Sequence, residues 1–253
     1  MKSLQLISHL LDYPTDELYG QLQQSKTWLA NELDLDANQQ PPLLEFIEHY
    51  QQLDLLDWQS EYDGLFERGR SLSLLLFEHI HGESRDRGQA MIDLMQQYKQ
   101  AGLAIDIKEL PDYIPLFLEF VATQGEANAQ AWLQDVAHIL ALLQVRLTQR
   151  KSHYANLFTV LVSLSKADID LADLAKQTKN EPRDDTKEAI DKVWEEEMVK
   201  FVADDPNCDS SISRPSEGQR RDQQVPIQFV DAAFAQPQPP TKQSFINKPA
   251  GVN

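Results

Sequence analysis

The chain has 253 residues, of which 42% are hydrophobic and 25% are charged, as is typical of a globular protein that can bury one sizeable core. Its formal net charge of −17 disfavours general binding to nucleic-acid backbones and favours a basic partner. The lone cysteine, Cys208, excludes an internal disulfide and argues against a cysteine-rich zinc site or a protein-held iron–sulfur cluster.

Neither a secretory signal nor a membrane span is expected from the sequence. The first six residues place polar side chains among the apolar ones, unlike the apolar stretch of a signal peptide. The longest apolar runs, such as residues 139–143, fall far short of the ~20 residues that a membrane helix needs. We therefore expect a soluble protein that stays in the cytoplasm.

The first half of the chain shows apolar residues at helical spacing, which predicts a series of amphipathic helices. Tyr13-Pro14 should end the first of them, and Thr15 can cap the second. The expected helices are a first with Leu4, Ile7, Leu10 and Leu11 inward, a second with Leu18, Leu22, Leu29 and Leu33, a third from Pro41 with Leu43, Phe46, Ile47 and Tyr50, a fourth from Leu55 to Phe66, a short fifth capped by Ser71 and reaching His79, and a sixth from Ser84 to Gly102.

The second half continues in the same way. Asp112 is the expected N-cap of a helix that carries Leu116, Phe117 and Phe120. Further helices are expected from Ala129 to Arg150, Ser152 to Lys166 and Leu171 to Lys179, followed by a last one that begins at a capping box of Asp185 and Glu188.

These patterns predict an all-α protein. Only nine glycines are present, and no stretch alternates strictly between polar and apolar residues over the length of a strand. Seven of the 13 prolines lie beyond Ala203, together with many Ser and Gln residues. We expect one multi-helix bundle domain over residues 1–203 and a flexible tail over residues 204–253.

Histidines and arginines near the middle of the chain are candidate ligand-binding residues. His79 and His81 stand two positions apart, so on one helix they point in different directions and cannot share a metal ion. Four arginines, which suggest an anion site such as one for phosphate, are Arg68, Arg70, Arg85 and Arg87. The alternative is that they pair with nearby acids, namely Glu67, Glu78, Glu83 and Asp86.

No motif supports catalysis. The sequence holds no P-loop, no GxGxxG, no HExxH and no GxSxG. The segment 109–115 combines two prolines with Asp112 and Tyr113, which indicates either a well-capped helix start or a rigid loop that presents a polar–aromatic pair to a ligand.

Two long segments resemble a known family. Residues 62–70 read YDGLFERGR and residues 73–91 read SLLLFEHIHGESRDRGQAM, while residues 109–119 and 184–201 carry further similarity. They resemble the TorD-like redox-enzyme maturation chaperones, and among them the assembly chaperones of molybdenum nitrate reductase. Tyr113 stands where many relatives have histidine, so a role that needs a titrating imidazole is not expected there.

The resemblance implies an all-helical chaperone that is not an enzyme and holds no permanent cofactor. It implies binding of the N-terminal segment of the catalytic (alpha) subunit of respiratory nitrate reductase in the cytoplasm. The subunit would stay competent to receive bis-molybdopterin guanine dinucleotide and iron–sulfur clusters before it docks at the membrane, with cofactor-biosynthesis proteins as possible further partners. The alternatives are a chaperone for another molybdoenzyme, a metal enzyme built on His79 and His81, and a helical adaptor.

The expected client site combines large apolar groups with acids, as a basic amphipathic helix would require. Pro111 and Pro115 restrict the backbone there and lower the entropy lost on binding. The expected client-binding residues are Tyr62, Leu65, Phe66, Phe77, Glu78, Asp112, Tyr113, Leu116 and Glu119. For Leu65, Phe66, Phe77 and Leu116 the alternative is burial in the core.

Deletion of the tail after about Asp205 should leave a folded protein that still binds its client. The tail is rich in proline and polar residues, and the helical periodicity lies before it. Circular dichroism and a client-binding assay on the truncated chain would check this. Loss of helicity or of client binding would show that the tail belongs to the working domain.

Overall fold

The structure is a computed structural model that describes residues 1–29, 35–80, 86–103, 105, 109–192 and 194–195. The expected all-α fold is confirmed, since the regular structure of these residues is helical apart from one isolated antiparallel β-bridge between Leu75 and Tyr113. The helices are α1 (Lys2–Leu11), α2 (Asp16–Leu29), α3 (Gln40–Tyr50), α4 (Leu55–Phe66), α5 (Leu76–Ile80), α6 (Asp86–Gln100), α7 (Ile114–Thr123), α8 (Glu126–Gln149), α9 (Tyr154–Ser165) and α10 (Leu171–Thr178). The proposed tail, residues 204–253, lies outside the described residues.

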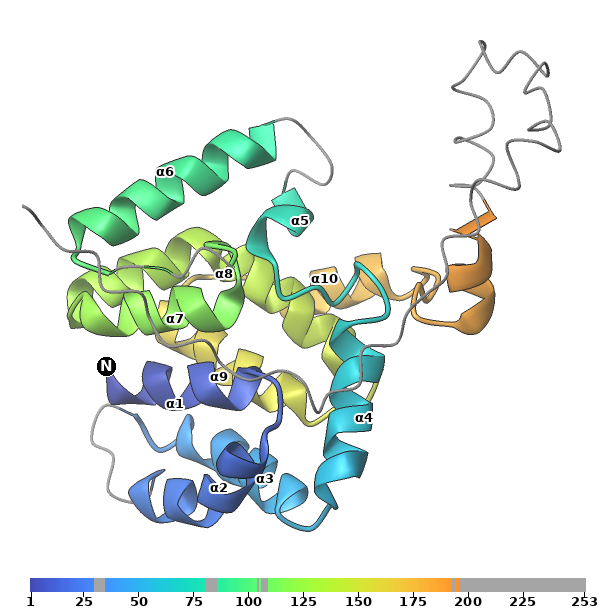
Figure 1. Ribbon diagram of the computed structural model, residues 1–253, viewed down its shortest axis with the longest axis horizontal. Coiled ribbons are helices and arrows are strands. Elements are labelled where there is room, and N and C mark those ends of the chain that lie inside the picture. The colour runs from blue at the N-terminus through green and yellow to red at the C-terminus, as the bar shows by residue number, and fades with distance from the viewer. Residues whose placement is uncertain (30–34, 81–85, 104, 106–108, 193, 196–253) are drawn as a thin grey trace, which may run out of the picture. The chain divides into compact units, whose positions relative to one another are not determined.

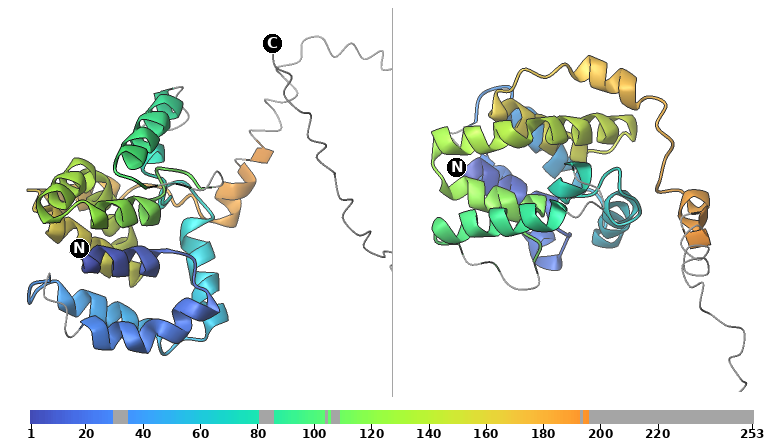
Figure 2. Two further views of the ribbon diagram at one scale, coloured as in Figure 1. Left: turned by 60° about the vertical axis from the view of Figure 1, so that its left-hand side comes forward. Right: turned by 90° about the horizontal axis from the view of Figure 1, so that it is seen from above.

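The helices of residues 1–195 pack in layers, which Figures 1 and 2 show from three directions. α9 lies in the interior and contacts α8, α3 and α1, while α1 also lies along α7. α2 and α3 pack together on one side, and α6 lies on the opposite side beyond α7 and α8. No helix in the described part of the chain is long and apolar enough to cross a membrane.

The composition of each helix explains how deeply it is buried in the bundle. α9 and α7 are apolar around most of their circumference, as is typical of helices that are covered on several sides. α9 buries Leu157, Phe158, Val160 and Leu161 among other residues. α2 and α6 instead bury narrow stripes, which in α6 are Leu94 and Tyr98. Such helices are held on the surface of the bundle by one face.

A cluster of buried aromatic side chains joins α3, α4 and α9. Trp58 is fully buried, and its indole nitrogen donates a hydrogen bond of 2.8 Å to the hydroxyl of Tyr154. The Tyr50 ring stacks on Trp58 with ring centres 4.9 Å apart, and Phe46 packs edge-on against Tyr154 at 5.1 Å. Tyr and Trp that are buried usually need such a polar partner. The Trp58–Tyr154 bond therefore orients the cluster.

Two of the predicted helix ends are confirmed. The Thr15 hydroxyl accepts a hydrogen bond from the Leu18 amide and so caps α2. Gly102 follows the end of α6 with φ of +83°, and the Leu103 amide donates to the Tyr98 carbonyl. This is the left-handed ending that glycine permits.

Three predicted caps are wrong, and in each case the side chain is bonded elsewhere. The N-cap of α7 is Tyr113 and not Asp112, since the Asp112 carboxylate bonds the Phe77 amide instead. The last helix begins after Thr186, whose hydroxyl accepts from the Ala189 amide, while Asp185 pairs with arginines. Ser71 does not start α5, which begins at Leu76.

Replacing Tyr154 by phenylalanine should destabilise the fold without a change of shape. The substitution leaves the buried Trp58 indole N–H without its acceptor, which should cost about 1–3 kcal/mol of unfolding free energy. Urea unfolding followed by tryptophan fluorescence would measure it. Tyr13→Phe is the matched control, because that ring is 40% exposed, and equal losses in the two variants would contradict the account.

Candidate functional site

Two of the family-like segments, residues 73–91 and 109–119, meet at the β-bridge between Leu75 and Tyr113. The Leu76 amide donates to the Asp112 carbonyl at 2.9 Å, and the Ile114 amide donates to the Leu74 carbonyl at 2.8 Å. This pairing places the start of α5 against the start of α7. Residues that are far apart in the sequence, and that we expected to form one site, are thus neighbours here.

Asp112 is the buried centre of this junction. Its side chain is 0% exposed, and its Oδ2 accepts a hydrogen bond of 3.2 Å from the Phe77 amide. Arg87 lies 3.7 Å from the same oxygen and also pairs with Glu78 at 3.2 Å. Burial raises the pKa of Asp112 above 3.8, although the Phe77 amide and the Arg87 charge act in the opposite direction. A side chain so placed holds the two segments together and is not reachable by a client.

Tyr113 connects the same junction to the end of α1. Its hydroxyl donates a hydrogen bond of 3.1 Å to Asp12 Oδ1 and lies 3.3 Å from the hydroxyl of Tyr62. The Tyr62 hydroxyl in turn donates to the Leu11 carbonyl at 3.2 Å. Burial raises the pKa of both tyrosines, so both hydroxyls stay protonated at neutral pH. Tyr113 is half-buried and faces the surface at Asp12.

The other expected client-binding residues do not share one surface. Tyr62, Leu65 and Phe66 belong to the hydrophobic core, while Phe77 and Leu116 are half-buried against it. Burial in the core is therefore the observed state of Leu65 and Phe66. Glu78 is half-buried in its pair with Arg87, and Glu119 alone of the nine lines a large groove.

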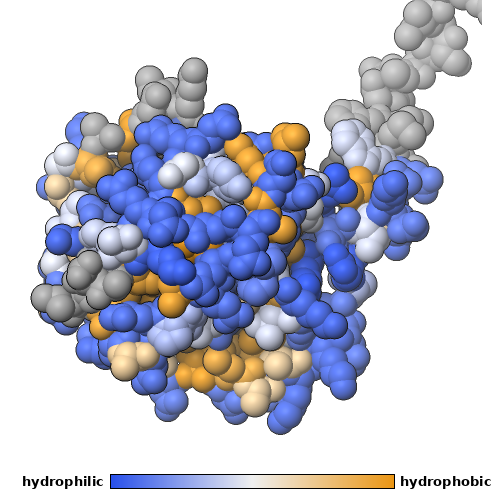
Figure 3. All heavy atoms as spheres, turned by 90° about the horizontal axis from the view of Figure 1, so that it is seen from below, coloured by the Kyte–Doolittle hydropathy of each residue, from blue (hydrophilic) through white to orange (hydrophobic). Residues whose placement is uncertain are grey.

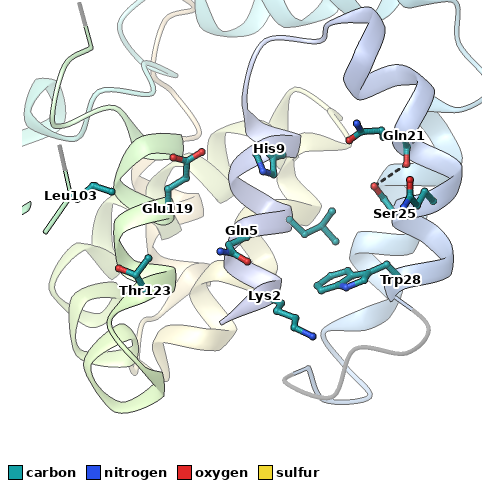
Figure 4. Close-up of a pocket in the computed structure, with 11 residues that line it drawn as sticks. Lys2, Gln5, His9, Gln21, Ser25, Trp28, Leu103, Glu119 and Thr123 are labelled. Carbon is teal, nitrogen blue, oxygen red and sulfur yellow. Dashed lines mark hydrogen bonds between the residues drawn. The ribbon is translucent and has the colours of Figure 1, made fainter. Parts of the chain in front are cut away.

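That groove has a volume of about 710 Å³ and runs over the exposed face of α1. Figure 4 shows Trp28 and Ser25 of α2 on one side of α1, and Glu119 and Thr123 of α7 with Leu103 on the other. The lining residues are Lys2, Gln5, Leu6, His9, Gln21, Gln24, Ser25, Trp28, Leu103, Glu119 and Thr123. The apolar groups Leu6, Trp28 and Leu103 lie among polar side chains, as in sites that bind an amphipathic segment.

A second hollow of about 260 Å³ extends the groove toward the junction. It shares four lining residues with the first and is lined by Leu6, His9, Asp12, Tyr13, Thr15, Glu17, Leu18, Gln21 and Ser25. Because Asp12 is hydrogen-bonded to Tyr113, the groove ends at the family-like segments. Its carboxylates, Asp12, Glu17 and Glu119, outnumber its one lysine, Lys2.

The residues that α1 and α2 contribute to the groove were not among those expected from the sequence. The buried stripes of these helices are Leu4, Ile7, Leu10 and Leu11 in α1 and Leu22 and Leu29 in α2. Leu6 and Trp28 lie outside both stripes. A large apolar residue outside the buried stripe of its helix could have indicated a binding surface on α1 and α2. Figure 3 shows hydrophobic residues in patches on a largely hydrophilic face of the molecule.

His79 and Arg87, from the candidate ligand-binding residues of the middle segment, take structural positions. The ring nitrogen Nε2 of His79 lies 2.8 Å from the Ser73 carbonyl, and burial lowers the pKa of His79. No group of three or more potential metal ligands occurs among the described residues. Arg87 pairs with Glu78, as the local-pairing alternative expects, whereas His81, Glu83 and Arg85 lie outside the described residues.

Comparison with known proteins gives a consistent result. Residues 30–160 match the model of the family described as nitrate reductase delta subunit. The chain is 47% identical over 213 residues to the nitrate reductase molybdenum cofactor assembly chaperone NarJ of Escherichia coli K12, covering 84% of this chain and 90% of that protein. It is 44% identical over 233 residues to NarW of the same strain, described as a probable chaperone of the same kind, covering 91% and 97%.

A more distant relative is the probable assembly chaperone NarJ of Bacillus subtilis 168. The identity is 30% over 158 residues, which cover 62% of this chain and 84% of that protein. Similarity thus extends beyond the enterobacterial proteins.

Asp112→Ala should lower the unfolding free energy by about 1–3 kcal/mol, because the Phe77 amide and Arg87 lose a buried partner. Asp112→Asn keeps an acceptor oxygen and avoids the cost of a buried charge, so it should cost less. Urea unfolding at pH 7 would compare them with Asp135→Ala on the exposed face of α8. A loss in Asp112→Ala no larger than in the control would contradict the structural role.

Proposed function

Because this chain belongs to the nitrate reductase delta subunit family, we propose that it is a molybdenum cofactor assembly chaperone for a nitrate reductase. The observation that carries the proposal is the 47% identity to NarJ of Escherichia coli over 84% of the chain. On this proposal the chain is not an enzyme and acts in the cytoplasm.

The client in this proposal is the N-terminal segment of the catalytic (alpha) subunit. The chaperone would hold the subunit open until bis-molybdopterin guanine dinucleotide and the iron–sulfur clusters have been inserted, and would then leave before the subunit docks at the membrane. A partner that must leave needs only moderate affinity, of about −8 kcal/mol for a micromolar Kd.

The groove over α1 is the site that we assign to this segment. Its apolar floor, from Leu6 to Trp28 and Leu103, fits the apolar face of an amphipathic helix. Its three carboxylates against one lysine suit a basic segment, in keeping with the acidity of the chain. Two of the client-binding residues expected from the sequence lie at this groove. Glu119 lines it, and Tyr113 is hydrogen-bonded to Asp12 at its end.

The remaining family-like residues have an indirect role in this proposal. Tyr62 and Asp112 are buried and fix the end of α1, which forms the floor of the groove, and the start of α7, which forms the side that carries Glu119. Leu65 and Phe66 pack in the core behind them. Substitutions at these positions would change the groove by moving its walls and not by removing a contact with the client.

Trp28→Ala should weaken binding of a synthetic peptide from the client's N-terminal segment by tenfold or more, about 1.4 kcal/mol. The indole lines the groove, and aromatic anchors in a pocket carry much of the binding energy of such interfaces. Isothermal titration calorimetry would measure the affinity, and thermal unfolding would show that the variant is folded.

Leu56→Ala is the matched control, since Leu56 is 73% exposed on α4 and does not line the groove. Its peptide affinity should equal that of the unmodified protein. A Trp28→Ala protein that binds the peptide as tightly as the control would show that the client sits elsewhere. Tight binding of N-terminal peptides from unrelated molybdoenzymes would instead assign a different client.

A further inference from the structure

The turn that follows α4 holds a carboxylate as an anion-binding site would. The Ser71 amide donates 2.7 Å to Asp184 Oδ2, and the Ser71 hydroxyl donates 2.6 Å to Oδ1. The Arg70 amide is a further donor to Asp184, and these bonds lower its pKa although burial acts to raise it. A Cβ at Gly69 would lie 2.8 Å from the carboxylate, so the glycine permits the close approach. Concave groups of backbone amides of this kind bind anions.

Arg146, in the last turn of α8, and Arg150, the C-cap residue of that helix, complete this site. Arg150 Nη2 lies 3.3 Å from Asp184 Oδ1, and Arg150 Nη1 lies 3.2 Å from Asp185 Oδ2. One turn earlier, Arg146 forms a two-bond pair with Glu181, with distances of 2.9 and 3.0 Å. The side chains of Arg146 and Arg150 are only 16% and 11% exposed. Two guanidinium groups therefore face one small, partly covered site.

The three carboxylates come from a single short segment, residues 179–186, which we call the strap. Its sequence, KNEPRDDT, holds no aliphatic or aromatic side chain apart from its proline. The side chains of Glu181 and Asp184 are 42% and 34% exposed, so these two carboxylates stay accessible to solvent, whereas the side chain of Asp185 is 5% exposed. Displacement of the strap therefore requires an anion that replaces the bonds of Asp184 to the turn and of Asp185 to Arg150.

We propose that the turn 69–71, together with Arg146 and Arg150, is a binding site for a phosphoryl group, which the strap carboxylates occupy in the free protein. A phosphoryl group carries about −1.5 to −2 charges and three acceptor oxygens. It matches the amide, hydroxyl and guanidinium donors that now hold Asp184 and Asp185. The site stands apart from the groove over α1 and does not depend on the client assigned there.

The two guanidinium groups of this site do not come from the four arginines that stand close together in the sequence, Arg68, Arg70, Arg85 and Arg87. Arg87 is used in the Asp112 junction, and Arg68 is exposed on the surface. Arg146, from the last turn of α8, and Arg150, which follows that helix, supply the guanidinium groups instead. From the original group, the backbone of Arg70 contributes its amide.

The test compares phosphate binding by the full-length chain and by its Asp184→Ala variant. Isothermal titration calorimetry with inorganic phosphate, and separately with pyrophosphate, would be run against chloride at matched ionic strength. Removal of the internal carboxylate should tighten binding of one or both anions at least tenfold. Adding Arg150→Ala to the variant should abolish that gain.

Glu188→Ala is the matched control, because it removes one exposed carboxylate from the helix that follows the strap and leaves the site occupied. Should Asp184→Ala not fold, Asp184→Asn keeps the size of the side chain and should show a smaller gain of the same sign. A folded Asp184 variant that binds both anions no better than Glu188→Ala would overturn the proposal. So would a gain that survives Arg150→Ala, since this would be a general effect of charge.

Discussion

The burial of α9 is the constraint on which the rest of the structure depends. This apolar helix contacts α8, α3 and α1, so each of these helices must turn its own apolar stripe toward it. Burial of apolar area contributes about 25 cal/mol per Å², and α9 buries most of its side chains. With its inner face held by α9 and α7, α1 leaves its outer face, with Leu6 and His9, as the floor of a groove.

The sequence predicted the helices well because their signals are local. The periodicity of apolar residues located α4 from Leu55 to Phe66, and the Thr15 cap and the Gly102 ending follow from chemistry within one turn. The predicted caps at Asp112 and Asp185 failed for the opposite reason. The carboxylate of Asp112 accepts a hydrogen bond from the amide of Phe77, 35 residues away, and that of Asp185 pairs with Arg150, just after the end of α8. Local patterns hold no information about such partners.

The candidate site was predictable only in part, for a related physical reason. The family-like segments were correctly recognised as belonging together, and the bridge between Leu75 and Tyr113 joins them. Large apolar groups beside acids suggested a binding surface, yet Leu65 and Phe66 pack inward, as apolar helix residues usually do. The groove itself is formed by α1, α2 and α7, and its shape follows from tertiary packing. Trp28 became a candidate only when its position beside α1 was known.

Capture of the client from cells tests the central claim most directly. The full-length chain would be purified from cells that make the nitrate reductase, and its bound proteins would be identified by mass spectrometry. The account predicts that the catalytic subunit is recovered in amounts comparable to the chaperone, and that deletion of the subunit's N-terminal segment abolishes this high-affinity recovery. Equal recovery of a subunit that lacks the segment, or capture of a different molybdoenzyme in its place, would contradict the account.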